Sequence, residues 1–193
     1  MNVQVLKDKE LIVAYLEGND KAFEVLLNRH RDKIYTSIYL FVKDTDLAND
    51  IFQDVFIKII DTLRKGKYNH EGKFLQWAMR ISYNMCVDNF RRSKRRTKVS
   101  ASETFDIFDV LESKDENMET TMIKSQMHKK VRKLVDQLPP EQKEVVILRH
   151  YADMSFKEIS QLTRVSINTA LGRMRYALIN MRKMAGEKEL VMA

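Results

Sequence analysis

The chain has 193 residues, of which 44% are hydrophobic, with a formal net charge of +7 and a single cysteine. This length can supply cores for two small domains, but not for one large enzyme domain with further modules. The positive charge favours an anionic partner, and the lone Cys86 excludes an internal disulfide and any metal site built from several cysteines, which fits a reducing compartment.

The charge is distributed unevenly along the chain. Residues 1–98 contain 19 basic and 13 acidic residues, residues 99–126 contain 2 and 7, and residues 127–193 contain 13 and 7. We therefore predict two basic domains, residues 1–98 and 127–193, joined by an acidic linker, residues 99–126.

Glycine and proline are scarce, with 5 and 2 residues, and β-branched residues rarely alternate with polar ones. This pattern disfavours strands and predicts an all-α fold of two small helical domains. No apolar run reaches the roughly 18 residues of a membrane-spanning helix, and the first ten residues lack the apolar segment of a signal peptide. We expect a cytoplasmic protein without membrane insertion.

The first predicted helix begins near Asp20. Its apolar residues are Phe23, Leu26, Leu27, Ile34, Ile38 and Leu40. A second helix is strongly amphipathic, because its apolar residues recur at helical spacing. They are Ala48, Ile51, Phe52, Val55, Phe56, Ile59, Ile60 and Leu63, and the opposite face carries Asn49, Asp50, Gln53 and Asp54. Such a polar face is usually solvated, and the alternative is that it docks onto another protein.

A loop rich in glycine and basic residues follows at 65–73 and presents Tyr68, Asn69 and His70. An exposed aromatic side chain at this point offers a stacking surface for an unpaired base. A third helix runs from about Phe74 past Phe90. We expect it to bury Trp77, Ala78, Ile81 and Met85 and to expose Arg80, Asn84, Asp88, Arg91 and Arg92. The basic run at its end attracts phosphates, although such runs often only solubilise a helix end.

The C-terminal part has the pattern of a helix-turn-helix. Pro139 and Pro140 separate two helices, since proline in the first turn gives up an amide that has no partner there. Ser155 and Glu158 have the spacing of a capping box for the next helix. This helix carries Phe156, Ile159 and Leu162, and the turn after it falls at residues 164–165.

Ser166 is expected to cap the last helix, with Thr169 where a capping box prefers Glu or Gln. Three- and four-residue spacing predicts its buried side, which consists of Ile167, Ala170, Met174, Ala177 and Leu178. The opposite side presents Asn168, Leu171, Gly172, Arg175 and Tyr176, with Arg173 and Arg182 placed to reach phosphates. Small or polar groups flanked by arginines suit insertion into a major groove, although a plain helical tail would show similar periodicity.

Taken in this order, the motifs resemble bacterial sigma-70-type factors. Residues 48–56, ANDIFQDVF, and the helix from Phe74 to Arg92 with Trp77, Asn84 and Asp88 resemble domain two of that family, and residues 127–183 resemble domain four. The absence of a substantial module between them matches the extracytoplasmic-function (ECF) subgroup. The resemblance implies a factor that directs core RNA polymerase to specific promoters and promotes DNA melting at transcription initiation.

The resemblance also assigns roles to residues. It implies docking on the β′ clamp helices of core RNA polymerase by Asp46, Asn49, Asp50, Gln53 and Asp54, and a contact of the second domain with the β flap. It implies contact with the minus-ten element, including capture of a flipped base, by Tyr68, Asn69, His70, Arg80, Asn84, Asp88, Arg91 and Arg92. It implies contact with the minus-thirty-five element by Ser166, Asn168, Thr169, Leu171, Gly172, Arg173, Arg175 and Tyr176.

Two features qualify these expectations. Leu171 and Gly172 replace the longer polar side chains of many relatives, so Arg175, apolar contact and DNA shape would supply discrimination. The acidic linker would be repelled by DNA, and at about 3.3 Å per residue it could span about 90 Å, more than the roughly 70 Å of two duplex turns. A further hypothesis is that the linker threads a basic channel of the polymerase.

The resemblance makes a membrane-linked anti-sigma factor another expected partner. We expect no cofactor, no metal and no catalytic residue, because the four histidines lie far apart and no glycine-rich phosphate loop is present. The leading alternative is a stand-alone helix-turn-helix transcriptional regulator, and a metal-dependent nuclease is a weaker one. Cys86 could act as a redox switch, but a lone cysteine on a mostly buried helix is more often a small core residue.

Overall fold

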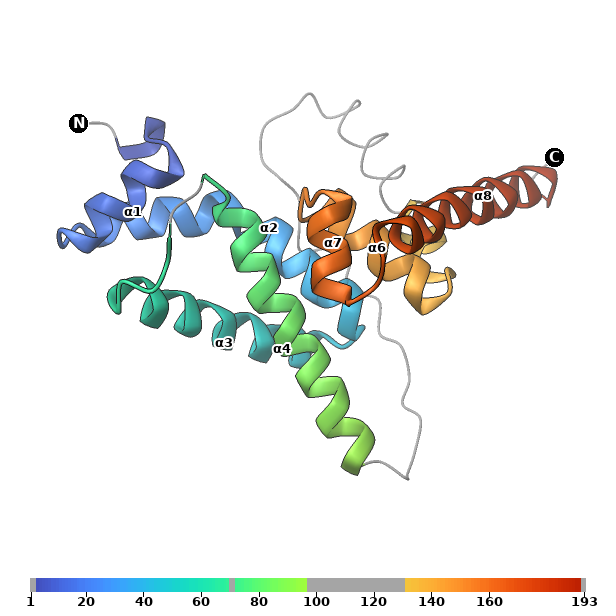
Figure 1. The fold of residues 1–193 in the computed structure, drawn as a ribbon, viewed down its shortest axis with the longest axis horizontal. Coiled ribbons are helices and arrows are strands. Elements are labelled where there is room, and N and C mark those ends of the chain that lie inside the picture. The colour runs from blue at the N-terminus through green and yellow to red at the C-terminus, as the bar shows by residue number, and fades with distance from the viewer. Residues whose placement is uncertain (1–2, 70–71, 97–130, 192–193) are drawn as a thin grey trace. The chain divides into compact units, whose positions relative to one another are not determined.

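The structure, a computed structural model, describes residues 3–69, 72–96 and 131–191. Within these ranges every regular element is helical, which confirms the all-α fold. The helices form two compact units, one containing α1 to α4 and the other α6 to α8 (Figure 1). The predicted acidic linker, residues 99–126, and the loop residue His70 lie outside the described residues.

In the first unit, α2 contacts each of the other three helices. A short 3-10 turn at Val3–Val5 precedes α1 (Asp8–Leu16), α2 (Asp20–Val42), α3 (Thr45–Arg64) and α4 (Phe74–Arg96). The largest fully buried side chains of this unit are Leu11, Leu26, Ile34, Ile38, Leu40, Ile59, Leu63, Phe74 and Met79. The three helices expected from apolar spacing are therefore confirmed.

The sequence does not predict α1, because its apolar residues lie on both sides of the helix. Leu11, Ile12 and Tyr15 are buried, whereas Val13 and Leu16 are exposed. Such a distribution lacks the single apolar stripe by which amphipathic helices are recognised. Packing against α2 supplies the stability that the local pattern does not reveal.

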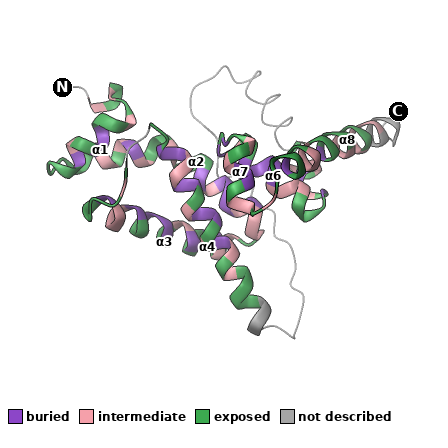
Figure 2. Cartoon of the chain, viewed as in Figure 1, coloured by how far each residue is buried: buried purple, intermediate pink, exposed green. Residues whose placement is uncertain are grey.

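The amphipathic pattern of α3 is confirmed (Figure 2). One side is buried and consists of Ala48, Ile51, Val55, Phe56, Ile59 and Leu63. Asp44 caps the helix, because its Oδ1 accepts a hydrogen bond from the Leu47 N–H at 2.9 Å. The cap and the buried stripe together fix which side of α3 faces solvent.

The buried face of α4 differs from the prediction. Ala78 is fully buried as expected, but Trp77, Ile81 and Met85 are only half-buried. The buried residues are Phe74, Leu75, Ala78, Met79, Ser82, Tyr83 and Cys86. Because α4 contacts both α2 and α3, its buried surface is centred between two partners rather than on one stripe.

In the second unit, α8 (Ile167–Val191) contacts both α6 (Pro140–His150) and α7 (Phe156–Thr163). The predicted capping box is confirmed at the start of α7. The Ser155 N–H donates to Glu158 Oε2 at 2.8 Å, and Ser155 Oγ accepts from the Glu158 N–H at 3.2 Å. Arg164 ends α7 in the left-handed conformation, with φ 58°, at the predicted turn.

The cap of α8 is also confirmed, because Ser166 Oγ accepts from the Thr169 N–H at 3.0 Å. Its buried side is only partly as predicted. Ala170 and Ala177 are fully buried and Met174 is half-buried, whereas Ile167 and Leu178 are exposed. Ala177 belongs to a buried cluster with Val146 of α6, against which Met174 packs, and Ile167 and Leu178 lie outside this cluster.

Candidate nucleic-acid and polymerase interfaces

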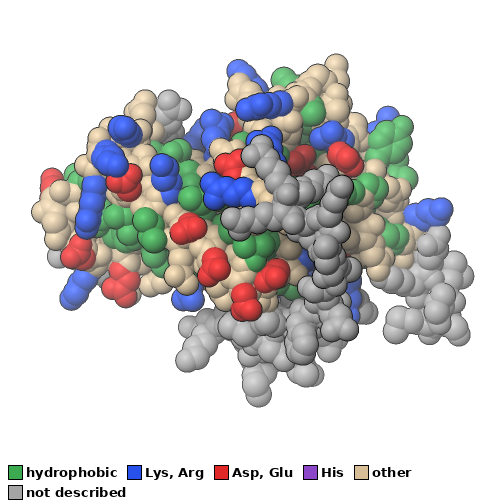
Figure 3. All heavy atoms as spheres, turned by 90° about the horizontal axis from the view of Figure 1, so that it is seen from below, with side chains coloured by type: hydrophobic (Ala, Val, Ile, Leu, Met, Phe, Trp, Pro, Cys, Tyr) green, Lys and Arg blue, Asp and Glu red, His purple; other side chains and the backbone are tan. Residues whose placement is uncertain are grey.

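The polar residues expected to dock on a protein partner share the exposed side of α3. All of Asp46, Asn49, Asp50, Gln53 and Asp54 are exposed. The view from below shows acidic side chains gathered on that side of the molecule (Figure 3). Burial and, secondly, the charge of Asp46 raise the pKa of the Tyr35 phenol. The exposed side of α3 is therefore an acidic surface.

Ile57 belongs to the same side of α3 and is 64% exposed. It follows Gln53 and Asp54 by four and three residues, which places the three side chains on one helix face. An exposed apolar residue next to polar ones offers area that a protein partner can bury. The sequence contains a signal for it, because Ile57 falls on the same helical face as Gln53 and Asp54 and not on the buried one.

Tyr68 rests on the first turns of α4 rather than standing fully exposed as predicted. Its ring centroid lies 4.3 Å from that of Trp77 and 6.1 Å from that of Phe74, and Tyr68 is half-buried. The adjacent Asn69 is exposed. Tyr68 is thus supported by Trp77, a residue that the sequence pattern assigns to the core.

The predicted DNA-facing residues of α4 are all exposed, namely Arg80, Asn84, Asp88, Arg91 and Arg92. They recur every three or four residues, so they form a strip that begins one turn after Trp77. Arg91 Nη1 lies 3.7 Å from Asp88 Oδ1. An exposed pair of this kind is weak, so a phosphate can readily replace the carboxylate as the partner of Arg91.

The N-terminal half of α8 presents the residues expected to face duplex DNA. Ser166, Asn168, Thr169, Leu171, Arg175 and Tyr176 are exposed, and Gly172 is half-buried. A Cβ added at Gly172 would meet no atom within 4 Å. The absence of a side chain there is therefore not a packing requirement of the fold.

Arg173 differs from its neighbours on α8. Its Nη1 lies 3.4 Å from Glu144 Oε2 on α6, and the two side chains are only 25% and 23% exposed. The guanidinium therefore joins α8 to α6, whereas Arg175 projects into solvent. Contact of Arg173 with a phosphate, as predicted, would therefore require its guanidinium to leave Glu144.

The described residues include no group of three or more His, Cys, Asp or Glu residues arranged to hold a metal ion. Cys86 is buried, and burial raises the pKa of its thiol to about 12. Within the same ranges, no helix has the length and apolarity needed to cross a membrane.

Two family models match the chain over these surfaces. The model of Sigma-70 region 2 matches residues 26–96, which include α3 and α4. The model of Sigma-70 region 4 matches residues 128–175, which include α6, α7 and the start of α8. Between them the two matches cover more than half of the chain. The chain belongs to the sigma-70 family.

Individual relatives agree with this assignment. The sigma factor is 26% identical to the RNA polymerase sigma-H factor of Pseudomonas aeruginosa, over 86% of its own length and 88% of the relative. It is 22% identical to the ECF RNA polymerase sigma factor SigW of Bacillus subtilis, over 91% and 95%. The chain is thus an ECF sigma factor that directs RNA polymerase to promoters, and the stand-alone regulator is not favoured.

The fold is similar to that of a solved sigma factor. The structure of RpoE in complex with the anti-sigma factor NepR, from Bartonella quintana, matches with a TM-score of 0.64 and 16% identity. The match covers 86% of the present chain and 98% of that one. The two chains therefore share the fold, in agreement with the two family models.

Proposed function

We propose that the first unit of this sigma factor binds core RNA polymerase through α3 and the minus-ten element through the 65–73 loop and α4. The observation that carries the proposal is the separation of charge between two exposed helix faces. The face of α3 is acidic and contains Asp46, Asp50 and Asp54, whereas α4 exposes Arg80, Arg91 and Arg92. An acidic face repels DNA and suits a protein partner, while the arginines suit phosphates.

The expected partner of α3 is the pair of clamp helices of the β′ subunit. Ile57 supplies an apolar contact and the surrounding polar residues supply complementary hydrogen bonds and charge. Interfaces of this type combine an apolar centre with a polar rim. Asp46, Asn49, Asp50, Gln53 and Asp54 would form that rim.

In the minus-ten element, Tyr68 provides the stacking surface for a base flipped out of the nontemplate strand. Stacking contributes about 1–3 kcal/mol per base, which offsets the few kcal/mol needed to unstack it. Asn69 is adjacent and His70, outside the described residues, is expected to complete the site. Catalysis of bond chemistry is not required for this step, and we infer that the protein is not an enzyme.

We assign the minus-thirty-five element to α8, the second helix of the helix-turn-helix. The exposed Leu171 suits a thymine methyl group, and Arg175 suits a guanine or a phosphate. The other candidate contacts are Ser166, Asn168, Thr169, Gly172 and Tyr176, whereas Arg173 is paired with Glu144 and would reach DNA only by leaving it. We expect the second unit also to contact the β flap of the polymerase.

An anti-sigma factor is the proposed regulatory partner. Support comes from the similarity in fold to the Bartonella quintana RpoE, which was solved with the anti-sigma factor NepR. The proposed compartment is the cytoplasm, where core RNA polymerase acts. Neither proposal depends on a metal or a cofactor.

Run-off transcription tests the proposed function. Core RNA polymerase is incubated with a promoter library, with and without the purified chain. We expect specific transcripts only when both are present. Tight binding of duplex operator DNA by the chain alone, with no specific transcripts, would instead support the stand-alone regulator.

A further inference from the structure

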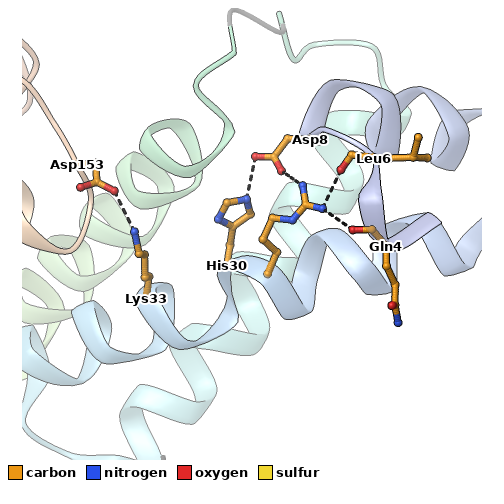
Figure 4. A network of polar contacts seen from close by, with 7 residues as sticks. Gln4, Leu6, Asp8, His30, Lys33 and Asp153 are labelled. Carbon is orange, nitrogen blue, oxygen red and sulfur yellow. Dashed lines mark hydrogen bonds and ion pairs between the residues drawn. The ribbon is translucent and has the colours of Figure 1, made fainter. Parts of the chain in front are cut away.

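A row of contacts joins the start of α1 to the aromatic residues beneath the 65–73 loop. It begins at Asp8, in the first turn of α1. Asp8 Oδ2 lies 2.8 Å from His30 Nε2, and Asp8 Oδ1 accepts a hydrogen bond from Arg29 Nη1 at 2.7 Å (Figure 4). Because a carboxylate only accepts, Nε2 of His30 is the donor.

Arg29 holds Asp8 in place from the other side. Its Nη2 donates to the backbone carbonyl of Leu6 at 2.8 Å and to that of Gln4 at 3.3 Å (Figure 4). The guanidinium thereby ties the segment before α1 to α2 and fixes the orientation of the carboxylate. Charge-assisted bonds of this kind are short and directional, so the bond from His30 to Asp8 also has a defined direction.

His30 continues the row towards the loop. Its side chain is only 12% exposed, and its ring centroid lies 5.4 Å from that of Phe74. Phe74 is 1% exposed, and its ring lies 5.7 Å from that of Trp77 and 6.1 Å from that of Tyr68. The imidazole therefore contacts Phe74 within the cluster that supports Tyr68.

Tyr68 lies outside the regular elements, so side-chain packing orients its ring rather than a helix. The described residues between α3 and α4 form no helix, and Gly66 and Gly72 adopt positive φ values of 62° and 74°. Glycine suits such positions because it adopts positive φ values without the steric cost that other residues incur. A ring that is already held in the binding orientation loses less freedom when a base stacks on it.

We propose that Asp8 and His30 are positioning residues for Tyr68. The hydrogen bond orients the imidazole, the imidazole restricts Phe74, and Phe74 together with Trp77 holds Tyr68 ready for stacking. This inference rests on the proposed capture of a base by Tyr68. It gives α1, which lies outside the residues matched by the region 2 model, a part in promoter melting without contact with DNA.

Trp77 makes the proposal directly measurable, because it is the only tryptophan of the chain. The full-length chain is prepared as wild type, His30→Leu, His30→Phe and Asp8→Asn. Asp32→Asn serves as the matched control, since Asp32 is an exposed residue of α2 and the charge change equals that of Asp8→Asn. Acrylamide quenching of Trp77, affinity for core polymerase, and permanganate reactivity of promoter thymines are measured for each.

We expect His30→Leu to increase the quenching of Trp77 and to lower the open-complex yield about three- to tenfold, the size of a lost aromatic contact. Affinity for core polymerase is expected to stay unchanged. His30→Phe should recover part of the loss, because it restores a ring against Phe74. Asp8→Asn should act in the same direction as His30→Leu, and Asp32→Asn should match wild type.

The proposal is wrong if His30→Leu and Asp8→Asn lower only the melting temperature, with Trp77 quenching and permanganate reactivity equal to wild type. If His30→Leu does not fold, the results for Asp8→Asn test the positioning role. Measurement of Tyr68→Ala under the same conditions distinguishes failure of the proposed base capture from failure of the positioning role alone. Normal melting by Tyr68→Ala would reject base capture and the positioning role together, whereas a defect in Tyr68→Ala without one in His30→Leu rejects only the positioning role.

Discussion

Arg173 on α8 and Glu144 on α6 form an ion pair, with Nη1 and Oε2 3.4 Å apart. Both side chains are mostly buried, whereas Arg175, two residues further along α8, is exposed. Two arginines that look alike in the sequence therefore have different surroundings. One holds α8 against α6, and the other is available to a nucleic acid.

This difference predicts that substitutions of Arg175 and Arg173 change the salt dependence of DNA binding to different extents. Arg175→Ala should weaken binding to minus-thirty-five DNA and reduce the slope of log affinity against log salt by about one. Arg173→Ala should mainly destabilise the second unit, by roughly 0.5–1 kcal/mol, as for a partly exposed ion pair. Fluorescence anisotropy over a salt series, with thermal unfolding, measures both effects. Equal changes in the salt slope would contradict the assignment.

The exposed Ile57 predicts an energetic centre in the α3 surface. Ile57→Ser should weaken association with core polymerase about fivefold or more, as for a central interface residue, without lowering the melting temperature. Val13→Ser is the matched control, because Val13 is an exposed apolar residue on α1. Surface-immobilised core polymerase gives both affinities. Equal affinities of the two variants would show that Ile57 is only a solvated side chain.

Tyr68 is predicted to act after polymerase binding. Tyr68→Ala should reduce open-complex formation roughly five- to a hundredfold, the range expected from the loss of one stacked base, while affinity for core polymerase is retained. Tyr68→Phe keeps the ring and should behave nearly as wild type. Permanganate footprinting of the minus-ten thymines provides the measurement, and a footprint of Tyr68→Ala that matches wild type would exclude base capture by this residue.

The capping box of α7 predicts a local stability effect. Ser155→Ala removes the hydroxyl that accepts from the Glu158 N–H and should destabilise the second unit by about 1 kcal/mol. Ser155→Asp retains an acceptor at the same place and should lose much less. Differential scanning calorimetry of the two variants checks this, and equal losses would mean that the cap contributes nothing.

Because Cys86 is buried, we expect its thiol to be unreactive in the folded chain and reactive after unfolding. Because burial raises the pKa of the thiol to about 12, the folded chain should react slowly with iodoacetamide at pH 8, and urea should restore rapid labelling. The raised pKa also means that the unfolded chain releases this proton first. The contribution of the protonated Cys86 thiol to the free energy of unfolding is therefore complete below about pH 8.5, the ordinary pKa of a cysteine. This contribution declines as the pH rises further. Rapid labelling of the native chain would contradict burial of the thiol.

Local patterns in the sequence were sufficient for much of the fold. The amphipathic spacing of α3 and the caps at Ser155 and Ser166 involve residues within four positions of one another, so they are visible without a structure. The same spacing predicts that Asn49, Asp50, Gln53 and Asp54 share one face. These features arise from helix geometry alone.

Packing decided the rest, because it joins residues that are distant along the chain. Asp8 and His30 are 22 residues apart, and Glu144 and Arg173 are 29 apart. No periodicity within one helix reveals such pairs. The contact of Tyr68 with Trp77 is equally invisible, and because of it Trp77 supports a loop residue instead of lying in the core. Helical spacing determines which side chains share a face, whereas the neighbour that covers the face depends on how separate helices pack in three dimensions.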